Sequence, residues 1–542
     1  MNFWLQHLPI VPVAVPLLAG AAMLLFGESQ RKRRAMLALT STLVQFAAAV
    51  TLLIMTTDAV TSIWPQGIGV YAIGSWAAPF GIVLVVDRLS ALMVTLVAML
   101  ALPALVYSLA RWDRVGVHYH SLFQFLLMGL NGAFLTGDLF NLFVFFEVLL
   151  AASYGLLLHG SGVVRVKPGL HYIVVNLVGS LFFLIGAALI YGVTGTLNMA
   201  DLAVQVPALA PGDRGLFEAG AAILGVAFLV KAGSWPLNFW LAPAYAAAGA
   251  PVAAVFSIMT KVGIYAVLRI GSLLAASDAP APFAGQWLLC IGLATTVFGI
   301  VGMLAAQQLG RLIGFAVIVS SGTVLAAVGL DAENLTAPAL FYLLTSALTT
   351  AAFFLLTGMT ERTRTQVSAV ADAAPLPSAT YKAFGVEEPP QPQAPDDEVG
   401  IAIPAAMAFL GLAFIFCVVL VTGLPPLSGF LAKFALLSAA LAVTADVSPA
   451  TWMLVVALLA AGLAGVIALT RIGMRLFWSA AQRTTPRLRV IEAGPVAFLI
   501  LVCIAMTVGA SPLMTYLDAA SQMLHAPRTY IDAVLSPQEV VR

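Results

Sequence analysis

Charged residues are scarce in this chain. Only 9% of the 542 residues are charged, whereas 61% are hydrophobic, and the mean hydropathy is +1.01. This composition excludes an ordinary soluble protein and predicts an all-α protein that crosses the membrane many times. The formal net charge is +1 and the longest basic run is Arg31 to Arg34, so no feature indicates binding to nucleic acid.

Cysteine is also rare, and its placement argues against metal or redox chemistry. The three cysteines, Cys290, Cys417 and Cys503, lie in apolar segments without a CxxC pair or a histidine nearby, which is typical of small core residues. We expect no metal site and no cofactor. A cleavable secretory signal is not expected either, because residues 8–26 are apolar and precede the basic cluster, whereas such a signal carries its charge first. We interpret 8–26 as the first membrane helix.

The length of the apolar segments predicts the number of membrane spans. A spanning helix needs about 20 apolar residues, and this measure predicts about fourteen spans. They lie at 8–26, 35–56, 82–109, 119–136, 139–158, 171–193, 216–240, 251–273, 284–307, 311–330, 336–358, 402–444, 452–478 and 494–515. The twelfth is about twice the normal length and is interpreted as one broken helix, interrupted at Gly423, Pro425, Pro426 and Gly429.

Basic residues in the short loops predict the orientation. Alternate loops carry most of them, and lysine and arginine gather on the cytoplasmic side of membrane proteins. The basic set comprises Arg31 to Arg34, Arg111, Arg114, Arg165, Lys167, Arg311, Arg362, Arg364, Lys382, Arg471, Arg475, Arg483, Arg487 and Arg489. The opposite set has only Arg214, Arg528 and Arg542. The asymmetry predicts an even number of spans with both termini on the non-cytoplasmic side.

Two polar stretches lie outside the spans. Residues 361–400 combine proline, glutamine and acidic residues and are interpreted as a flexible cytoplasmic loop. The tail from Leu517 to Arg542 is interpreted as a short segment on the outer surface. Its apolar strip consists of Tyr530, Ile531, Val534 and Leu535. This strip either docks on a neighbouring subunit or packs at the membrane interface.

Two spans are interrupted in a similar way, which indicates an internal repeat. The segment LVKAGSWPLNFWL places Lys231 beside Gly233 and Pro236, and VTGLPPLSGFLAKF places Lys433 after a comparable break. Freed backbone groups are tolerated in a bilayer only where protein or water satisfies them. Breaks five helices apart are typical of inverted repeats in transporters. We predict helices 1–3 at 1–115, repeat one at 116–275, repeat two at 276–480 with the loop 360–400, and helix 14 with the tail at 481–542.

Four ionisable residues stand inside predicted spans: Glu147, Lys231, Lys261 and Lys433. Such residues are expensive in hydrocarbon and usually mark an ion or proton path. The alternatives are a static ion pair for Glu147 and snorkelling for the lysines. A buried lysine can release its proton, whereas arginine stays charged. Asp138 precedes Glu147 by nine residues and is either a loop or cap residue or part of the path.

Three segments together resemble a known family. They are HYHSLFQFLLMGLNGAFLTGDLFNLFVFFEVLLAASYGLLLHG, KAGSWPLNFWLAPAYAAAGAPVAAVFSIMTKVGIYAVLR and GLPPLSGFLAKFALL. They closely resemble the D-type subunits of the Mrp-type (Mnh or Pha) multisubunit monovalent cation/proton antiporters, which are related to the antiporter-like subunits of respiratory complex I and membrane-bound hydrogenases. The resemblance implies a fourteen-helix fold with two inverted five-helix repeats, a bacterial cell (cytoplasmic) membrane location, and the other Mrp subunits as partners.

The resemblance also implies residue roles. By matching position, Glu147 is the fifth-helix glutamate, Lys231 the lysine of the broken seventh helix, Lys261 that of the eighth and Lys433 that of the twelfth. Many relatives carry histidine where this chain has Tyr245, and histidine and lysine on the eleventh helix. Here that helix offers Thr345, Ser346, Thr349 and Thr350 beside Tyr342, and the tenth offers Ser320, Ser321 and Thr323. These hydroxyls either hold water between Lys261 and Lys433 or bond back to helix carbonyls.

The sequence therefore predicts proton translocation by coupled titration of Glu147 and the three lysines. A direct Glu147–Lys231 pair at about 4 Å would be worth about 4 kcal/mol at an effective dielectric of 20. The expected function is a subunit of a monovalent cation/proton antiporter, with Na⁺ as the cation, and not an enzyme. The alternatives are a proton-pumping subunit of a complex I-like or hydrogenase-type redox complex, which would be a translocase subunit, and a non-transporting scaffold.

Overall fold

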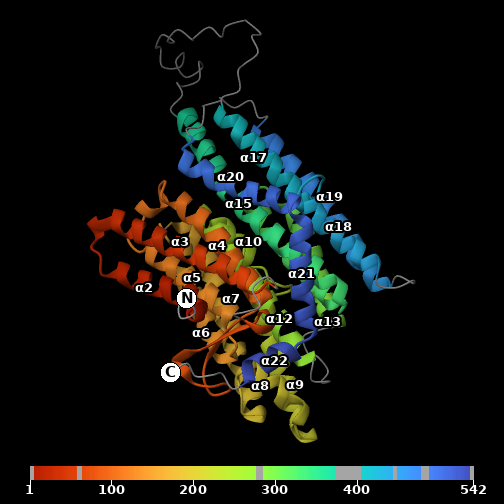
Figure 1. Ribbon diagram of the computed structural model, residues 1–542. Coiled ribbons are helices and arrows are strands. Elements are labelled where there is room, and N and C mark those ends of the chain that lie inside the picture. The colour runs from red at the N-terminus through yellow and green to blue at the C-terminus, as the bar shows by residue number, and fades with distance from the viewer. Residues whose placement is uncertain are drawn as a thin grey trace, which may run out of the picture.

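The structure is a computed structural model that describes residues 5–57, 64–160, 162–275, 285–372, 405–442, 448–477 and 488–536. In these residues the chain is nearly all helical (Figure 1). Helix is the form in which a single apolar segment satisfies all its own backbone hydrogen bonds, as the bilayer interior requires. The predicted all-α membrane fold is confirmed.

The helices follow one another along the chain with short connections. The α-helices are α2 (Val11–Leu24), α3 (Arg31–Met55), α4 (Arg88–Ser108), α5 (Tyr119–Leu135), α6 (Leu139–Leu157), α7 (Val163–Thr194), α8 (Met199–Gln205), α9 (Pro211–Ala232), α10 (Leu241–Ala247), α11 (Ala250–Phe256), α12 (Met259–Ala275), α13 (Gln286–Ala305), α14 (Leu309–Gly329), α15 (Glu333–Asp372), α17 (Ala405–Thr422), α18 (Ser428–Leu441), α19 (Pro449–Phe477), α20 (Val490–Val508), α21 (Ala510–His525) and α22 (Arg528–Leu535). Short 3-10 helices are η1 (Leu8–Ile10), η2 (Glu28–Gln30), η4 (Pro65–Gly67), η5 (Ile73–Ser75), η6 (Trp112–Arg114) and η7 (Val206–Ala208).

Twelve helices of the described chain are long and apolar enough to cross a membrane. They overlap twelve of the predicted spans, and the remaining two predicted spans fall on the shorter helices α2 and α5. The third span begins later than the predicted residue 82, at Arg88, because Val83–Val86 form a β-strand. The predicted twelfth span is indeed broken, into α17 and α18. The seventh is broken after α9. The inverted relation between the two five-helix repeats stays a prediction.

Helix α15 occupies the middle of the second half of the bundle. It packs against α11, α14, α17, α18, α20 and α21. In Figure 1 it runs between the red and orange helices of the N-terminal half and the blue pair α17 and α19. The hydroxyl-bearing face of α15 is thereby enclosed by other helices instead of facing lipid.

One end of the bundle carries a small β-hairpin that the sequence did not predict. Strand β1 (Gly69–Ala72) pairs antiparallel with β2 (Val83–Val86). The hairpin contacts η1 near the N-terminus and α22 near the C-terminus. Both described ends of the chain therefore lie at the same end of the bundle, as an even number of spans requires.

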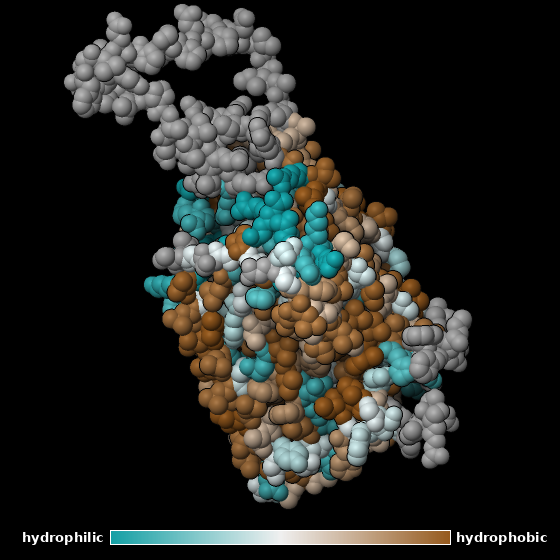
Figure 2. Space-filling model, turned by 90° about the vertical axis from the view of Figure 1, so that its left-hand side faces the viewer, coloured by the Kyte–Doolittle hydropathy of each residue, from teal (hydrophilic) through white to brown (hydrophobic). Residues whose placement is uncertain are grey.

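Arginines gather at the opposite end, called the basic end below. Arg34 donates to the Val117 carbonyl, Arg31 pairs with Asp113 at 3.3 Å, and Arg489 donates to the Ala110 carbonyl. Figure 2 shows hydrophilic residues gathered towards one end of the molecule above a broad hydrophobic surface. This separation is the structural counterpart of the charge asymmetry between the loops in the sequence.

Two interpretations of the polar segments change. Residues 361–372 are helical because α15 continues to Asp372, so the predicted loop is shorter than 361–400. The rest of that loop, 373–400, lies outside the described residues. The tail is helical, and Tyr530, Ile531 and Val534 of its apolar strip are buried within this chain, where α22 packs on α8 and β1. The strip is therefore not a free docking surface.

Candidate functional site

The break after α9 is held by side chains, which explains how it is tolerated at membrane depth. Gly233 ends the helix with φ +69, a left-handed conformation that glycine adopts without a Cβ penalty. The next residue, Ser234, donates from its backbone and its hydroxyl to the Leu229 carbonyl, at 3.0 and 2.9 Å. The Trp235 amide donates to Thr295 Oγ1 of α13 at 2.9 Å. The freed polar groups are thus paired by protein.

Glu147 and Lys231 are linked through a serine. Ser180 Oγ donates a short hydrogen bond to Glu147 Oε1, and the Lys231 ammonium donates to the same Ser180 oxygen at 3.3 Å. Lys231 also donates to the Asn176 carbonyl at 3.4 Å and lies 5.8 Å from the Phe146 ring centroid. No nitrogen–oxygen contact within 4.0 Å joins these two described residues, so they lie near each other without forming a direct ion pair. The serine hydroxyl stands between the charges.

Lys231 and Lys261 lie on helices whose backbones touch. A Cβ added to Gly263 of α12 would lie 2.6 Å from the Phe228 carbonyl oxygen of α9 and 2.5 Å from the Ala232 amide. The missing side chain lets the two helices cross at backbone contact. Thr260, beside Lys261, packs its methyl towards Gly233, and its buried hydroxyl has no hydrogen-bond partner in the described chain. Thr260 is a buried polar group at the crossing of α9 and α12 that the sequence analysis did not single out.

Lys261 is fully enclosed and bonds directly to serines of the tenth span, where the sequence analysis expected these hydroxyls to hold water. Its side chain is 1% exposed. Its ammonium donates to Ser320 Oγ at 2.8 Å and approaches Ser321 Oγ at 3.5 Å. Ser320 in turn bonds Ser346 Oγ of α15 at 2.6 Å. A continuous line of hydrogen bonds therefore leads from Lys261 across α14 to α15.

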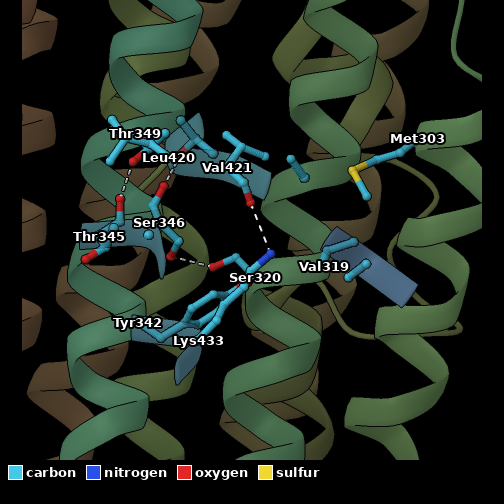
Figure 3. Close-up of a pocket in the computed structure, with 14 residues that line it drawn as sticks. Met303, Val319, Ser320, Tyr342, Thr345, Ser346, Thr349, Leu420, Val421 and Lys433 are labelled. Carbon is cyan, nitrogen blue, oxygen red and sulfur yellow. Dashed lines mark hydrogen bonds between the residues drawn. The ribbon is translucent and has the colours of Figure 1, made fainter. Parts of the chain in front are cut away.

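Beyond Ser346 the line opens into a small cavity, shown in Figure 3. Its volume is about 30 Å³, and a site of about 10–15 Å³ is enough for one water, so it has room for one or two. Polar residues around it are Ser320, Tyr342, Thr345, Ser346, Thr349, Thr350 and Lys433. The cavity spans the interval between Ser346 and Lys433 at the position where the sequence predicted held water.

The four hydroxyls of α15 are not equivalent. Thr349 and Thr350 bond back to the carbonyls of Thr345 and Ser346, both at 2.7 Å, which is the alternative weighed above. Ser346 also donates back to its own helix, to the Leu343 carbonyl at 3.0 Å, and in addition bonds Ser320 of α14. The buried Thr345 hydroxyl has no partner in the described chain, so among the four it is the one free to donate to water in the cavity.

Lys433 closes the line at the break between α17 and α18. Gly423 ends α17 with φ +76. The Lys433 ammonium donates to the Thr422 carbonyl at 2.7 Å and to the Val421 carbonyl at 3.3 Å. These carbonyls are the unpaired ones of a helix C-terminus, where a cation is favoured. The predicted breaks at Pro425, Pro426 and Gly429 coincide with the turn between the helices and the first residues of α18.

Three other predicted residues, Asp138, Tyr245 and Thr323, lie outside the hydrogen-bonded line and its small cavity. Asp138 is the N-cap of α6 and accepts from the Asn141 amide at 2.9 Å, so the cap interpretation is correct. Tyr245 is buried among Trp240, Phe256 and Phe354 and lines a second cavity at the basic end. Thr323 is buried on α14 but does not line the cavity beside Lys433.

Ser180 and Asn176 were missed by the sequence analysis. They stand four residues apart in the otherwise apolar run YIVVNLVGSLFF, so they share one face of α7. That spacing of polar side chains inside a span is a usable signal, although nothing local in it points to Glu147 and Lys231 on other helices.

Comparisons with known proteins show the family of the chain. A family model described as "NADH:quinone oxidoreductase/Mrp antiporter, TM" matches residues 136–379. A relative from Rhizobium meliloti (strain 1021), named as the D-type subunit of a probable K(+)/H(+) antiporter, is 52% identical, over 99% of this chain and 99% of its own. The corresponding D-type subunit of a Na(+)/H(+) antiporter from Bacillus subtilis (strain 168) is 32% identical, over 98% of this chain and 100% of its own.

Solved structures share the fold over almost the whole chain. A chain of the Mrp complex from Dietzia sp. DQ12-45-1b is 28% identical with a TM-score of 0.78, and the match covers 98% of this chain and 99% of that one. A chain of respiratory complex I from Thermus thermophilus with bound NADH has a TM-score of 0.70 at 20% identity, covering 98% and 100%. The second likeness shows the fold alone.

Proposed function

Because the chain belongs to the family of D-type subunits of Mrp-type cation/proton antiporters, we propose that it carries protons for a monovalent cation/proton antiporter along the buried line from Glu147 to Lys433. The observation that supports this route most directly is the pair of linked segments. One joins Glu147, Ser180 and Lys231. The other joins Lys261, Ser320 and Ser346 and reaches Lys433 across the small cavity.

Ser180 makes the first segment switchable. The protonated Lys231 is stabilised by the Glu147 carboxylate through the intervening hydroxyl. Two charges roughly 6 Å apart interact by about 3 kcal/mol at an effective dielectric of 20, which is about a hundredfold in proton affinity. Neutralising Glu147, or turning Ser180 away, releases the Lys231 proton towards Thr260 and Lys261.

In the second segment, from Lys261 to Lys433, the proton moves as each group in turn donates a hydrogen bond to the next. Lys261 donates to Ser320, and the Ser320–Ser346 bond can reverse its direction because either oxygen can donate. Water in the cavity beyond Ser346 then reaches Lys433. Because the Thr422 and Val421 carbonyls stabilise the ammonium, Lys433 holds a proton until the next charge arrives.

The two candidates for the exchanged cation are Na⁺ and K⁺. The sequence analysis expected Na⁺, and relatives 32% identical carry that ion in their names. The relative that is 52% identical carries K⁺ in its name, so K⁺ is a candidate beside Na⁺. Within the described chain there is no cluster of three or more metal-binding side chains. We propose that the cation crosses partly in other subunits, which are the expected partners, in a bacterial cytoplasmic membrane with both termini outside the cytoplasm.

The first prediction tests the route itself. In vesicles that contain the complete complex, Glu147→Gln and Lys231→Ala should each abolish cation-dependent proton exchange, measured by a pH-sensitive dye with Na⁺ and with K⁺. Glu218→Gln and Lys167→Ala are matched controls, because both side chains are exposed on helices that frame the site, α9 and α7 respectively.

Exchange at the wild-type rate in an assembled Glu147→Gln or Lys231→Ala complex would refute the route and leave the scaffold alternative. If these variants fail to assemble while Glu218→Gln and Lys167→Ala assemble normally, Glu147 and Lys231 are needed to hold helices together and not to carry protons. Subunit content is measured in the same vesicles, so the two outcomes are separated.

A further inference from the structure

A second, larger cavity lies at the basic end, away from the line of lysines. Its volume is about 390 Å³, which is within the range of about 300–1,000 Å³ typical of ligand sites. It is bounded by η6, α10, α11, α14 and the end of the spanning part of α15. Much of its wall consists of small residues, namely Ala246, Ala247, Ala248, Ala250, Ala253, Gly310 and Gly358.

Two arginines that line this cavity both lie over the ring of one tryptophan. The guanidinium carbons of Arg111 and Arg165 lie 5.2 and 5.6 Å from the Trp112 ring centroid. Arg165 is anchored, because its Nε donates to the Ala247 carbonyl at 3.1 Å and its Nη1 donates to the His159 carbonyl, which leaves Nη2 for a ligand. Arg111 is exposed. Planar guanidinium groups bind phosphate oxygens through paired N–H donors, so this arrangement suits an anion with several oxygens.

The cavity wall also includes a buried polar group without a hydrogen-bond partner in the described chain. Tyr245 lines it, is 1% exposed, and its hydroxyl has no hydrogen-bond partner in the described chain. A buried unpaired hydroxyl costs free energy unless a bound group satisfies it. Glu361 also lines the cavity, so the lining carries two positive charges and one negative charge.

We propose that this cavity binds a phosphate group, with Arg111 and Arg165 as its ligands and the Tyr245 hydroxyl as a deeper donor. The alanine-rich wall favours a phosphate carried by a membrane phospholipid over free phosphate, because the wall can pack against glycerol and the first acyl carbons. Basic pockets between spanning helices at a positively charged membrane face are sites of this kind. The site is separate from the proposed proton route.

The test is native mass spectrometry of the full-length chain in detergent, titrated with phosphatidylglycerol and, separately, with phosphatidylcholine. The wild type should bind phosphatidylglycerol more tightly. Arg111→Ala should weaken that binding about fivefold, the effect of one basic residue at an anionic lipid surface. Arg114→Ala is the matched control, because Arg114 is exposed on the 3-10 helix next to Arg111 but does not line the cavity.

Each other outcome overturns the proposal. Equal losses in Arg111→Ala and Arg114→Ala would mean diffuse surface attraction, and no loss in Arg111→Ala would remove the arginine site. Displacement of the lipid by inorganic phosphate alone would assign the site to a soluble phosphate. Tyr245→Phe keeps the ring packing and should also weaken binding, whereas unchanged affinity would show that the headgroup does not reach the buried hydroxyl.

Discussion

At the scale of single residues, Ser180 decides how Glu147 and Lys231 communicate. Its hydroxyl donates to the carboxylate and accepts from the ammonium, so neither charge is unpaired and neither is locked in a direct contact. A direct buried pair would resist separation, because each ion would lose its only partner. A bridging hydroxyl can rotate, which makes the link adjustable at small cost.

The second prediction follows from this bridge. Ser180→Ala should slow cation-dependent proton exchange by about tenfold to a hundredfold, because a hydrogen bond to a charged group is worth about 1.5 to 3 kcal/mol. Ser180→Thr retains the hydroxyl and should keep most of the activity. Initial rates in vesicles of equal subunit content check this, and an alanine variant as fast as wild type would show that Glu147 and Lys231 act without the serine.

The third prediction asks whether Lys433 must release a proton or only supply a positive charge. Lys433→Ala should impair exchange. Lys433→Arg keeps a cation near the Thr422 and Val421 carbonyls but cannot release its proton, so it should also be inactive. Full activity of the arginine variant, measured in the same vesicle assay, would mean that Lys433 serves only as a fixed positive charge.

At the scale of elements, α15 separates functional hydroxyls from structural ones. Ser346 and Thr349 both bond back to carbonyls of their own helix, but only Ser346 of the two also bonds Ser320 of α14. The fourth prediction is that Ser346→Ala slows proton flux in the reconstituted complex, while the isosteric Thr349→Val is nearly silent. The triple change Thr345→Val, Ser346→Ala and Thr349→Val should dry the cavity and slow flux further. Unchanged flux in the triple variant would move the proton route elsewhere.

The break in the twelfth helix depends on one glycine for two reasons. Gly423 has φ +76, and a Cβ there would lie 2.5 Å from Lys433 Cδ. The fifth prediction is that Gly423→Ala displaces Lys433, lowers exchange and costs about 1 to 3 kcal/mol of stability from backbone strain. Gly411→Ala on the same helix is the control, because nothing lies within 4 Å of the added Cβ. Thermal unfolding and exchange rates are measured on the same samples. A Gly423→Ala variant with wild-type stability and wild-type exchange would contradict the prediction.

At the scale of the whole molecule, the hairpin end is tied together by a buried ion pair. Arg269 of α12 donates to both Asp87 oxygens at 2.7 and 2.6 Å, and both residues are buried. The Tyr530 ring of α22 covers the guanidinium at 4.8 Å from its centroid. Asp87 also caps α4. The N-terminal strands, the eighth span and the C-terminal helix therefore share one point of attachment that is not on the proton route.

Much of this architecture was open to prediction from the sequence. Composition and apolar length determined the membrane class and the spans, because a bilayer imposes one thickness on every helix. Glycine and proline marked both broken helices, since they remove backbone options locally. The unusual position of charges in apolar runs marked Glu147, Lys231, Lys261 and Lys433 as candidates.

Only the tertiary structure decided which groups meet. Ser180 meets Lys231 because α7 packs on α9, and Thr260 meets Gly233 because α12 packs on α9. No local pattern encodes which faces of distant helices touch. The same holds for the α15 hydroxyls, whose bonds to Ser320 or to their own carbonyls depend on the neighbour. The strip at Tyr530 is buried because the hairpin end offers it a partner. The type and spacing of residues within one helix can be read from the sequence. Contacts between helices depend on how all the helices pack together.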